Sequence, residues 1–228
     1  MQLQGQVVAI TGAFGALGSA VVRSVLAEGA QVAAIDRAPS PRAPLEGAVL
    51  FGDVDLSGDT GARAAVDAIL ARFGRLDALV NIAGGFRWET LADGSLDTWN
   101  TLYELNLRTV VAACRAALPH LPSERGRIIN IGAAGAQKAA AGMGAYAASK
   151  AGVARLTEAL AEELKDRGIT VNALLPSIID TAANRADMPK ADFGKWVKPE
   201  QLADVIVFLL SPKSQAITGA LLPVTGRV

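Results

Sequence analysis

The sequence predicts one α/β domain in which a parallel sheet is covered by helices on both faces, and three observations lead to this prediction. Short apolar runs rich in β-branched residues alternate with longer segments of helical period, which is typical of successive βαβ units. The runs are apolar at nearly every position, as strands buried on both faces must be. No linker or internal repeat divides the 228 residues. We therefore expect a doubly wound fold with seven parallel strands, formed by residues 1–228 as a single domain.

Six of the expected strands are visible as apolar runs of five to seven residues. Their length and their content of Val and Ile favour strands over buried helix segments. In chain order they are QVVAIT, QVAAID, ALVNIAG, RIINIG, TVNALLP and ALLPV.

The segments between these runs carry the helices, and their ends are marked by residues that favour helix caps. Gly29, Gly74 and Gly168 lie where helices are expected to end, because a left-handed backbone often closes a helix. The residues suited to helix starts are Asp59, Ser95 and Pro199. The expected helices are residues 16–28, 59–72, 96–118, 145–166 and 199–210.

The composition excludes several classes of function. Lys plus Arg and Asp plus Glu number 22 each, so no net charge attracts nucleic acid or an anionic membrane. One cysteine, Cys114, and one histidine, His120, exclude a disulfide framework and are too few for a zinc site, so no metal is expected. No apolar stretch is long enough to span a membrane, and residues 1–22 lack the basic start of a signal peptide. We expect a cytoplasmic protein.

A glycine-rich loop follows the first strand and opens the first helix. Gly12, Gly15 and Gly18 are spaced so that the chain can turn tightly, a pyrophosphate can approach the backbone, and the helix can pack on the strand. Asp36 ends the second strand, where a carboxylate can accept both ribose hydroxyls and repel a 2′-phosphate. NAD is therefore favoured, while the neighbouring Arg37 leaves NADP open as the alternative.

Tyr146 and Lys150 stand four residues apart in the Ala- and Gly-rich stretch GAYAASKAG. Residues at this spacing share one helical face, so the phenol and the ammonium can converge. A positive neighbour stabilises phenolate, so we expect the pKa of Tyr146 to be lowered toward the range of a working acid or base. An ordinary solvated helical face is the alternative for this pair.

The chain resembles the short-chain dehydrogenase/reductases over essentially its whole length. Six motifs carry the resemblance in order: TGAFGALG, DVD at 53–55, NIAG at 81–84, LNL around Asn106, YAASK at 146–150 and PSIIDT at 176–181. The resemblance implies a Rossmann fold and transfer of hydride between a nicotinamide cofactor and a small-molecule substrate.

The resemblance also implies roles for particular residues. Tyr146 would be the proton donor or acceptor, Lys150 would lower its pKa and hold the nicotinamide ribose, and Asn106 would maintain a proton-relay water. The cofactor would contact Gly12, Phe14, Gly15, Ala16, Leu17, Gly18, Asp36, Arg37, Asp53, Val54, Asn81, Ala83, Gly84, Tyr146, Lys150, Pro176, Ile179 and Thr181.

The main departure from the family pattern is Ala133, which occupies the position of the family's substrate-orienting serine. Alanine cannot donate a hydrogen bond to a developing alkoxide. Either the chain keeps only dinucleotide binding, or its substrate does not need this donor, or another group such as Gln137 replaces it in an alcohol or ketone dehydrogenase. We favour a substrate that does not need the donor, because Tyr146, Lys150 and Asn106 are all present.

Residues 177–198 form the one long insertion, at the edge of the sheet where ligands bind in this architecture. We expect them to form the substrate loop. Their sequence, together with GAQKAAAGMGAYAASK, resembles the dihydropteridine reductases, which implies reduction of a C=N bond in a pterin-like ring. A pocket for such a flat ring would be walled by Trp88, Met143, Met188, Phe193 and Trp196. The alternative is that these apolar residues only anchor their loops.

The helices at 96–118 and 145–166 are rich in alanine, and small side chains allow close contacts between helices of two subunits. With the family resemblance, this predicts a homodimer or a homotetramer. A monomer with these helix faces in solvent is the alternative.

Overall fold

The computed structural model describes residues 1–228 and contains one seven-stranded sheet in which every strand pair is parallel. The order of the strands is β3-β2-β1-β4-β5-β6-β7, so the chain runs outward from β1 to one edge and then from β4 to the other. The strands are β1 (Val7–Thr11), β2 (Gln31–Ile35), β3 (Val49–Phe51), β4 (Ala78–Asn81), β5 (Arg127–Ile131), β6 (Thr170–Pro176) and β7 (Leu221–Val224). The predicted doubly wound fold is confirmed.

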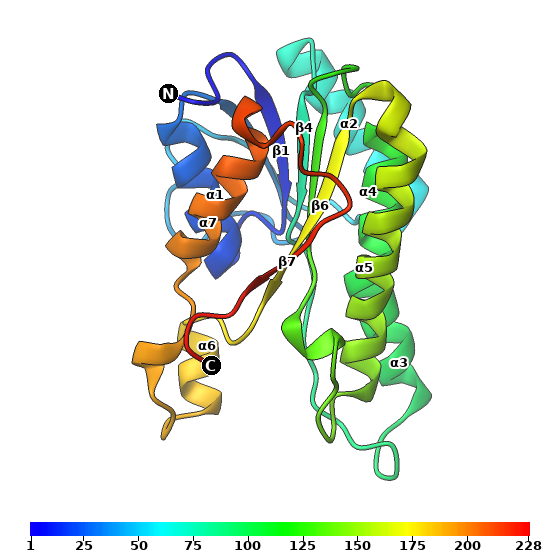
Figure 1. The fold of residues 1–228 in the computed structure, drawn as a ribbon, viewed down its shortest axis with the longest axis vertical. Coiled ribbons are helices and arrows are strands. Elements are labelled where there is room, and N and C mark those ends of the chain that lie inside the picture. The colour runs from blue at the N-terminus through cyan, green and yellow to red at the C-terminus, as the bar shows by residue number, and fades with distance from the viewer.

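Helices cover both faces of the sheet (Figure 1). On one face lie α1 (Ala16–Ala27) and α7 (Pro199–Leu210), and on the other α2 (Asp59–Phe73), α4 (Thr109–Ala117) and α5 (Gly144–Leu164). Two apolar clusters of 24 buried residues each lie between the sheet and these two helix layers, so neither face of the sheet is left open to solvent. This burial explains why the strands lack polar alternation.

Two elements differ from the prediction. The strand β3, at the edge of the sheet, was not located because it has only three residues and none of them is fully buried, which leaves no apolar run to recognise. The helix expected at 96–118 is divided into α3 (Leu96–Tyr103), a π-helical turn at Glu104–Arg108, and α4. The shorter elements are α6 (Ala182–Asp187) and the 3₁₀ turns Ala134–Ala136, Lys165–Arg167, Phe193–Lys195 and Pro212–Ser214.

The expected helix ends are present. Gly29, Gly74 and Gly168 all adopt positive φ angles, of 87°, 74° and 64°, where a residue with a side chain would be strained. Ser95 is the N-cap of α3, and its hydroxyl accepts a hydrogen bond of 3.0 Å from the backbone N–H of Asp97. These local signals therefore act as the sequence suggests.

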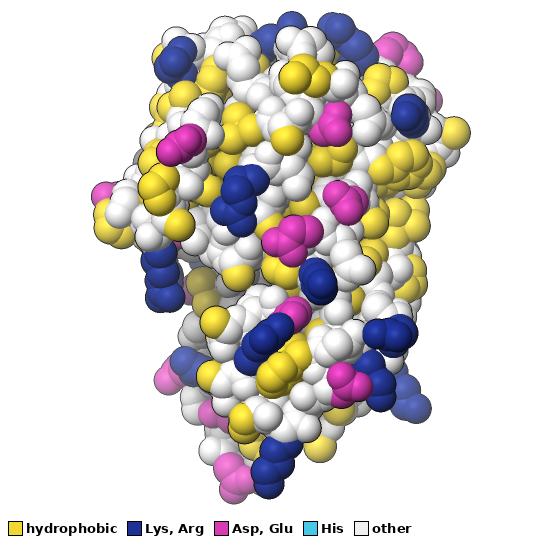
Figure 2. Space-filling model, turned by 90° about the vertical axis from the view of Figure 1, so that its left-hand side faces the viewer, with side chains coloured by type: hydrophobic (Ala, Val, Ile, Leu, Met, Phe, Trp, Pro, Cys, Tyr) yellow, Lys and Arg dark blue, Asp and Glu magenta, His cyan; other side chains and the backbone are white.

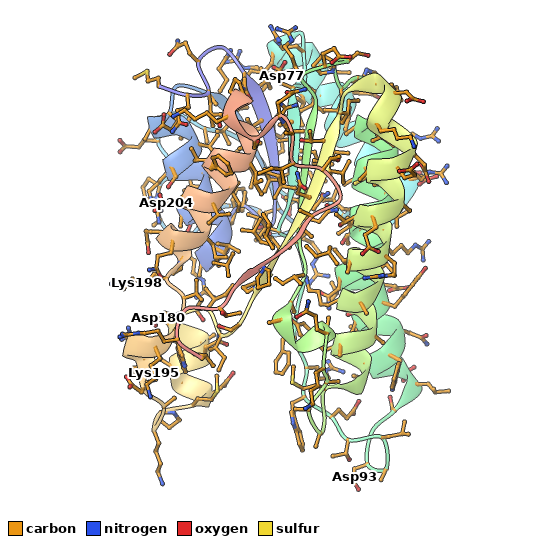
Figure 3. All side chains as sticks on the ribbon, in the orientation of Figure 1. Asp77, Asp93, Asp180, Lys195, Lys198 and Asp204 are labelled. Atoms are coloured by element: carbon orange, nitrogen blue, oxygen red, sulfur yellow. The ribbon has the colours of Figure 1, made fainter.

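The two ends of the sheet have different roles. At the amino end, Asp77 accepts a 2.8 Å hydrogen bond from the backbone N–H of Val7 and pairs with Arg75 at 2.6 Å, which ties β4 to β1 (Figure 3). At the carboxyl end, the insertion carries Asp180 and Lys195 and lies beyond the strands. The chain terminus holds this insertion, because the backbone N–H of Arg227 donates to the carbonyl of Lys195 at 3.0 Å.

Basic and acidic side chains are intermixed over the face that carries α1 and α7 (Figure 2). With a formal net charge of zero, this arrangement gives no field of one sign over that face. None of the helices combines the length and the apolar character that crossing a membrane requires.

Candidate active site

The glycine loop has the geometry that its spacing predicts. Gly12 has a φ of 63°, and a Cβ on it would lie 2.7 Å from the backbone nitrogen of Ala83. A Cβ on Gly18 would collide with the carbonyl of Gly12, so this glycine allows α1 to pack on the end of β1. Around Gly15 the nearest atom to such a Cβ is 3.4 Å away, which leaves the backbone accessible. The loop is thus tightly packed at Gly12 and Gly18, while its backbone at Gly15 stays accessible.

The first turn of α1 has no side chain that caps it. Gly15 is the N-cap, and Ala16 is the first helical residue. The backbone N–H groups of a first helical turn have no partner within the helix, and the helix dipole makes this end favourable for anions. The residues present therefore fit a bound pyrophosphate.

The Asp36 carboxylate has a structural role in the glycine loop. One carboxylate oxygen accepts a 2.9 Å hydrogen bond from the backbone N–H of Phe14, and the other accepts a 2.9 Å bond from Ala38. The carboxylate therefore holds the glycine loop against the end of β2. Because each oxygen can accept more than one hydrogen bond, capacity for ribose hydroxyls remains.

A cleft of about 1070 Å³ runs along the carboxyl edge from this loop. Its volume is at the upper limit of small-ligand pockets, as a dinucleotide requires. Of the residues expected to contact a cofactor, it is lined by Gly12, Phe14, Gly15, Ala16, Leu17, Gly18, Asp36, Arg37, Val54, Ala83, Gly84 and Thr181.

Six residues of the predicted cofactor set do not line this cleft; Tyr146 and Lys150 are described below with α5, and the other four are Asn81, Asp53, Pro176 and Ile179. Asn81 is buried, and its amide donates to Oδ1 of Asn130 on the neighbouring strand at 2.9 Å. Asp53 adopts a φ of 56° at the surface, and its neighbours Val54 and Asp55 line the cleft instead. Pro176 is buried at the end of β6, and Ile179 pairs with Val197 and packs on the core. The side chains of Asn81, Pro176 and Ile179 are thus engaged in the fold, whereas that of Asp53 is exposed.

The sequence reasoning missed one wall of the cleft, which is formed by the loop after β2. Ser40 and Arg42 of this loop line the cleft beside Arg37. The segment RAPSPRAP adds one further positive charge, Arg42, to Arg37 close to Asp36, and this local charge was the available signal.

Asn106 is fully buried and connects the cleft with α5. It lies in the π-helical turn between α3 and α4, a type of irregularity that often occurs at functional sites. Its side-chain oxygen accepts from the backbone N–H of Gly85 at 2.8 Å, and its amide donates to the carbonyl of Gly85 at 3.0 Å. The same amide donates to the Ser149 hydroxyl at 3.0 Å.

Ser149 is a second residue that the sequence reasoning missed. Its hydroxyl accepts from Asn106 and donates to the backbone carbonyl of Tyr146 at 2.7 Å. It therefore links the π-helical turn to the first turn of α5. Its place inside the YAASK motif was the signal that could have identified it.

Tyr146 and Lys150 lie in α5 as predicted, but they do not pair in this structure. The ammonium of Lys150 donates to the carbonyl of Ile131 at 2.7 Å, at the end of β5. Burial raises the pKa of Tyr146 to about 12 and lowers the pKa of Lys150 to about 8. The lowered tyrosine pKa expected from the spacing was wrong for this state, because desolvation outweighs any stabilisation of the phenolate by the ammonium.

Gly84 brings the cleft and the side-chain cluster together. A Cβ on Gly84 would lie 2.6 Å from Oδ1 of Asn106 and 3.4 Å from Nζ of Lys150, while Gly84 itself lines the cleft. The Asn106 amide and the Lys150 ammonium thus lie at the inner end of the cleft. Tyr146 lies one helical turn before Lys150 in α5, and its ring packs against Phe86 and does not line the cleft.

Ala133 is buried and lies two residues beyond β5, at the start of the turn Ala134–Ala136. Gln137, the proposed replacement donor, is exposed at the other end of that turn. The structure does not place its amide at the Ala133 position.

The buried Lys150 predicts a pH dependence of stability. Its pKa falls from 10.5 to about 8 on folding, so between these values the unfolded chain binds more protons and the free energy of unfolding rises with pH. The total effect is on the order of 3 kcal/mol. Urea unfolding gives the free energy of unfolding of the wild type and of Lys150→Met at each pH. From pH 8 to pH 10 the value for the wild type is expected to rise relative to that for Lys150→Met.

Burial raises the pKa of Cys114 to about 12, so this thiol makes the free energy of unfolding fall as pH rises. Because Cys114 is present in both the wild type and Lys150→Met, its contribution cancels when the two free energies are subtracted. A difference that stays constant with pH would show that Lys150 is not desolvated.

Comparison with known proteins agrees with this geometry. Residues 6–192 match the profile of the short chain dehydrogenase family. The 3-oxoacyl-acyl-carrier-protein reductase FabG of Vibrio cholerae is 32% identical over 241 residues, which cover 99% of this chain and 98% of that protein. The D-threitol dehydrogenase of Mycolicibacterium smegmatis is 32% identical over 243 residues, covering 99% and 93%.

Solved structures are similar over the same extent. A short-chain dehydrogenase/reductase from Serratia marcescens superposes with a TM-score of 0.91 at 32% identity, covering 100% of this chain and 99% of the other. The 3-ketoacyl-(acyl-carrier-protein) reductase of Brucella melitensis, complexed with NADH, has a TM-score of 0.87 at 29% identity, covering 98% of each chain. A blue fluorescent protein from a metagenomic library, in complex with NADPH, has the same TM-score at 31% identity, covering 100% and 99%. This chain therefore belongs to the short chain dehydrogenase family and is an NAD(P)-dependent oxidoreductase.

Proposed function

We propose that the protein reduces a C=O or C=N bond of a small molecule with a nicotinamide cofactor bound in the 1070 Å³ cleft. The observation that carries the proposal is the position of Asn106 and Lys150 against Gly84, at the inner end of that cleft. When bound, the cofactor supplies the hydride. The chain supplies position, electrostatics and a proton.

Tyr146 would donate the proton to the heteroatom of the substrate. Its raised pKa keeps the phenol protonated at neutral pH, which is the form that an acid needs. The pKa of about 8 leaves most of Lys150 charged at neutral pH, so its ammonium can stabilise the phenolate that remains. Asn106 would act by fixing the loop at Gly85, and its bonds to Gly85 and Ser149 support this positioning role.

We propose NADH as the preferred cofactor, with NADPH as the alternative. The Asp36 carboxylate lines the cleft and would repel a 2′-phosphate, whereas Arg37 and Arg42 on the adjoining wall would attract it. The carboxylate is held in place by two backbone N–H groups, so it cannot easily turn away.

Asp36→Asn is expected to shift the cofactor preference. Loss of the negative charge should lower the ratio of kcat/KM for NADH to that for NADPH by on the order of tenfold, which corresponds to about 1.4 kcal/mol. The measurement is initial rates with both cofactors at one ionic strength. A matched Arg42→Ala variant should change the ratio in the opposite direction, and an unchanged ratio in both variants would contradict this assignment.

The substrate is proposed to be a carbonyl compound or a pterin-like ring with a C=N bond. Ala133 favours the C=N acceptor, because a reaction without a tetrahedral alkoxide does not need the missing hydroxyl. The ketoacyl reductases among the relatives favour a ketone. The insertion at 177–198 is proposed as the substrate loop, since Thr181 and Ala182 from it line the cleft.

The deciding experiment compares quinonoid dihydropterin with a panel of ketones, using NADH and NADPH in parallel. Reduction of the pterin alone supports the C=N reading, and reduction of ketones alone contradicts it. Binding of NADH without turnover of any acceptor would favour the remaining possibility, a dinucleotide-binding protein without catalysis. Sedimentation of the same preparation tests the proposed homodimer or homotetramer.

A further inference from the structure

Phe86 places an apolar ring at the reacting phenol without packing into the core. Its ring meets the ring of Tyr146 edge to face, with centroids 4.9 Å apart and planes at 80°. Its side chain is nevertheless 57% exposed. Large apolar side chains gain little from such exposure, so the fold itself gives no reason for a phenylalanine here.

The residues on either side of Phe86 form hydrogen bonds with other segments. On one side Gly85 exchanges two hydrogen bonds with the Asn106 side chain, at 2.8 and 3.0 Å. On the other side the guanidinium of Arg87 donates to the Thr98 hydroxyl at 3.1 Å. The ring is therefore presented on a fixed loop rather than on a free one.

The next residues tie the same loop to the segment before α5. The indole N–H of Trp88 donates to the carbonyl of Ala141 at 2.9 Å, and the backbone N–H of Glu89 donates to Gly142 at 2.9 Å. A Cβ on Gly142 would collide with the Trp88 ring, so the indole lies directly on this glycine. Figure 3 shows the loop, with Asp93 at its tip, on the opposite side of the carboxyl edge from the insertion with Asp180.

We propose that Phe86 is a specificity-determining residue that packs against a flat, apolar group next to the reacting carbon of the substrate. The inference rests on the proposed function. Together the Phe86 and Tyr146 rings form two perpendicular apolar walls at the point of proton transfer. A fixed aromatic wall favours planar substrates, because neither partner loses much conformational freedom on contact. Aryl ketones and fused heterocycles share this chemistry, whereas short aliphatic ketones lack it.

The test compares Phe86→Ala with the wild type on acetophenone and on butan-2-one. The variant is expected to lose about tenfold in kcat/KM for acetophenone and less than about twofold for butan-2-one. Phe208→Ala is the matched control, since this phenylalanine is also exposed, at 40%, but lies on α7 across the sheet. Equal losses on both ketones would overturn the inference, because Phe86 would then act only by positioning Tyr146.

A binding measurement separates this inference from the proposed function. Calorimetry of acetophenone on the protein saturated with NAD⁺, which cannot transfer hydride to a ketone, should give a Kd about tenfold weaker for Phe86→Ala and unchanged for Phe208→Ala. This Kd can be measured even if no ketone is reduced. Failure to reduce any ketone would count against the proposed reaction and not against this inference. Equal affinity of the wild type and Phe86→Ala, or no binding to the wild type, would overturn the inference.

Discussion

Replacing Tyr146 by phenylalanine is expected to lower kcat by about 10²–10⁴-fold, a much larger effect than its effect on NADH affinity. The substitution removes only the phenolic oxygen, so the ring keeps its edge-to-face contact with Phe86 and its place in α5. The backbone carbonyl of residue 146 continues to accept from Ser149. The loss of kcat in Tyr146→Phe therefore measures proton donation by the phenol and not a change in the fold.

The measurement is single-turnover oxidation of NADH with any acceptor that the wild type reduces, together with titration of NADH binding. Phe86→Leu is a suitable companion, because it changes the neighbouring ring and leaves the acid in place. Unchanged turnover in Tyr146→Phe would show that another group donates the proton, and the proposed role of Tyr146 would be wrong.

Ala133→Ser is expected to raise kcat for ketones by tenfold or more and to leave reduction of a C=N acceptor unchanged. Removing one donor to a developing oxyanion costs about 10²–10³-fold in other enzymes, so restoring one should recover part of that amount. The gain is specific to ketones because only their reduction places negative charge on an oxygen. Rates with both classes of acceptor are compared in one preparation.

Ala133 is buried, so the added oxygen must fit a packed site. Thermal unfolding should accompany the kinetics, and Ala139→Ser at an exposed position of the same loop is the control. A ketone rate that does not rise in a stably folded Ala133→Ser protein would mean that the missing hydroxyl is not what limits ketone reduction.

The cofactor half of the site was largely predictable because its signals are local. A position that needs a positive φ or lies against a neighbouring backbone favours glycine, so Gly12 and Gly18 could be recognised from the sequence. Asp36 was recognised by its place at the end of a strand, and the structure adds that it also holds the loop through Phe14. The roles of these residues in binding stay predictions.

The other half of the site depends on contacts between distant segments. Asn106 reaches Gly85 across 21 residues and Ser149 across 43, and no spacing rule connects these positions. The wall made by Ser40 and Arg42 was missed for the same reason, since a loop faces a cleft only once the sheet has formed.

The sequence by itself determined the alternation of strands and helices, the glycine loop, the helix ends and the placement of Tyr146 and Lys150 on one helix. These depend on backbone preference and side-chain period, which act over a few residues. Only the tertiary structure decided the edge strand β3, the π-helical turn at Asn106 and the protonation of Tyr146 and Lys150. Edge position, helix irregularity and desolvation are set by what surrounds a residue in space, and neighbours in the chain do not specify that environment.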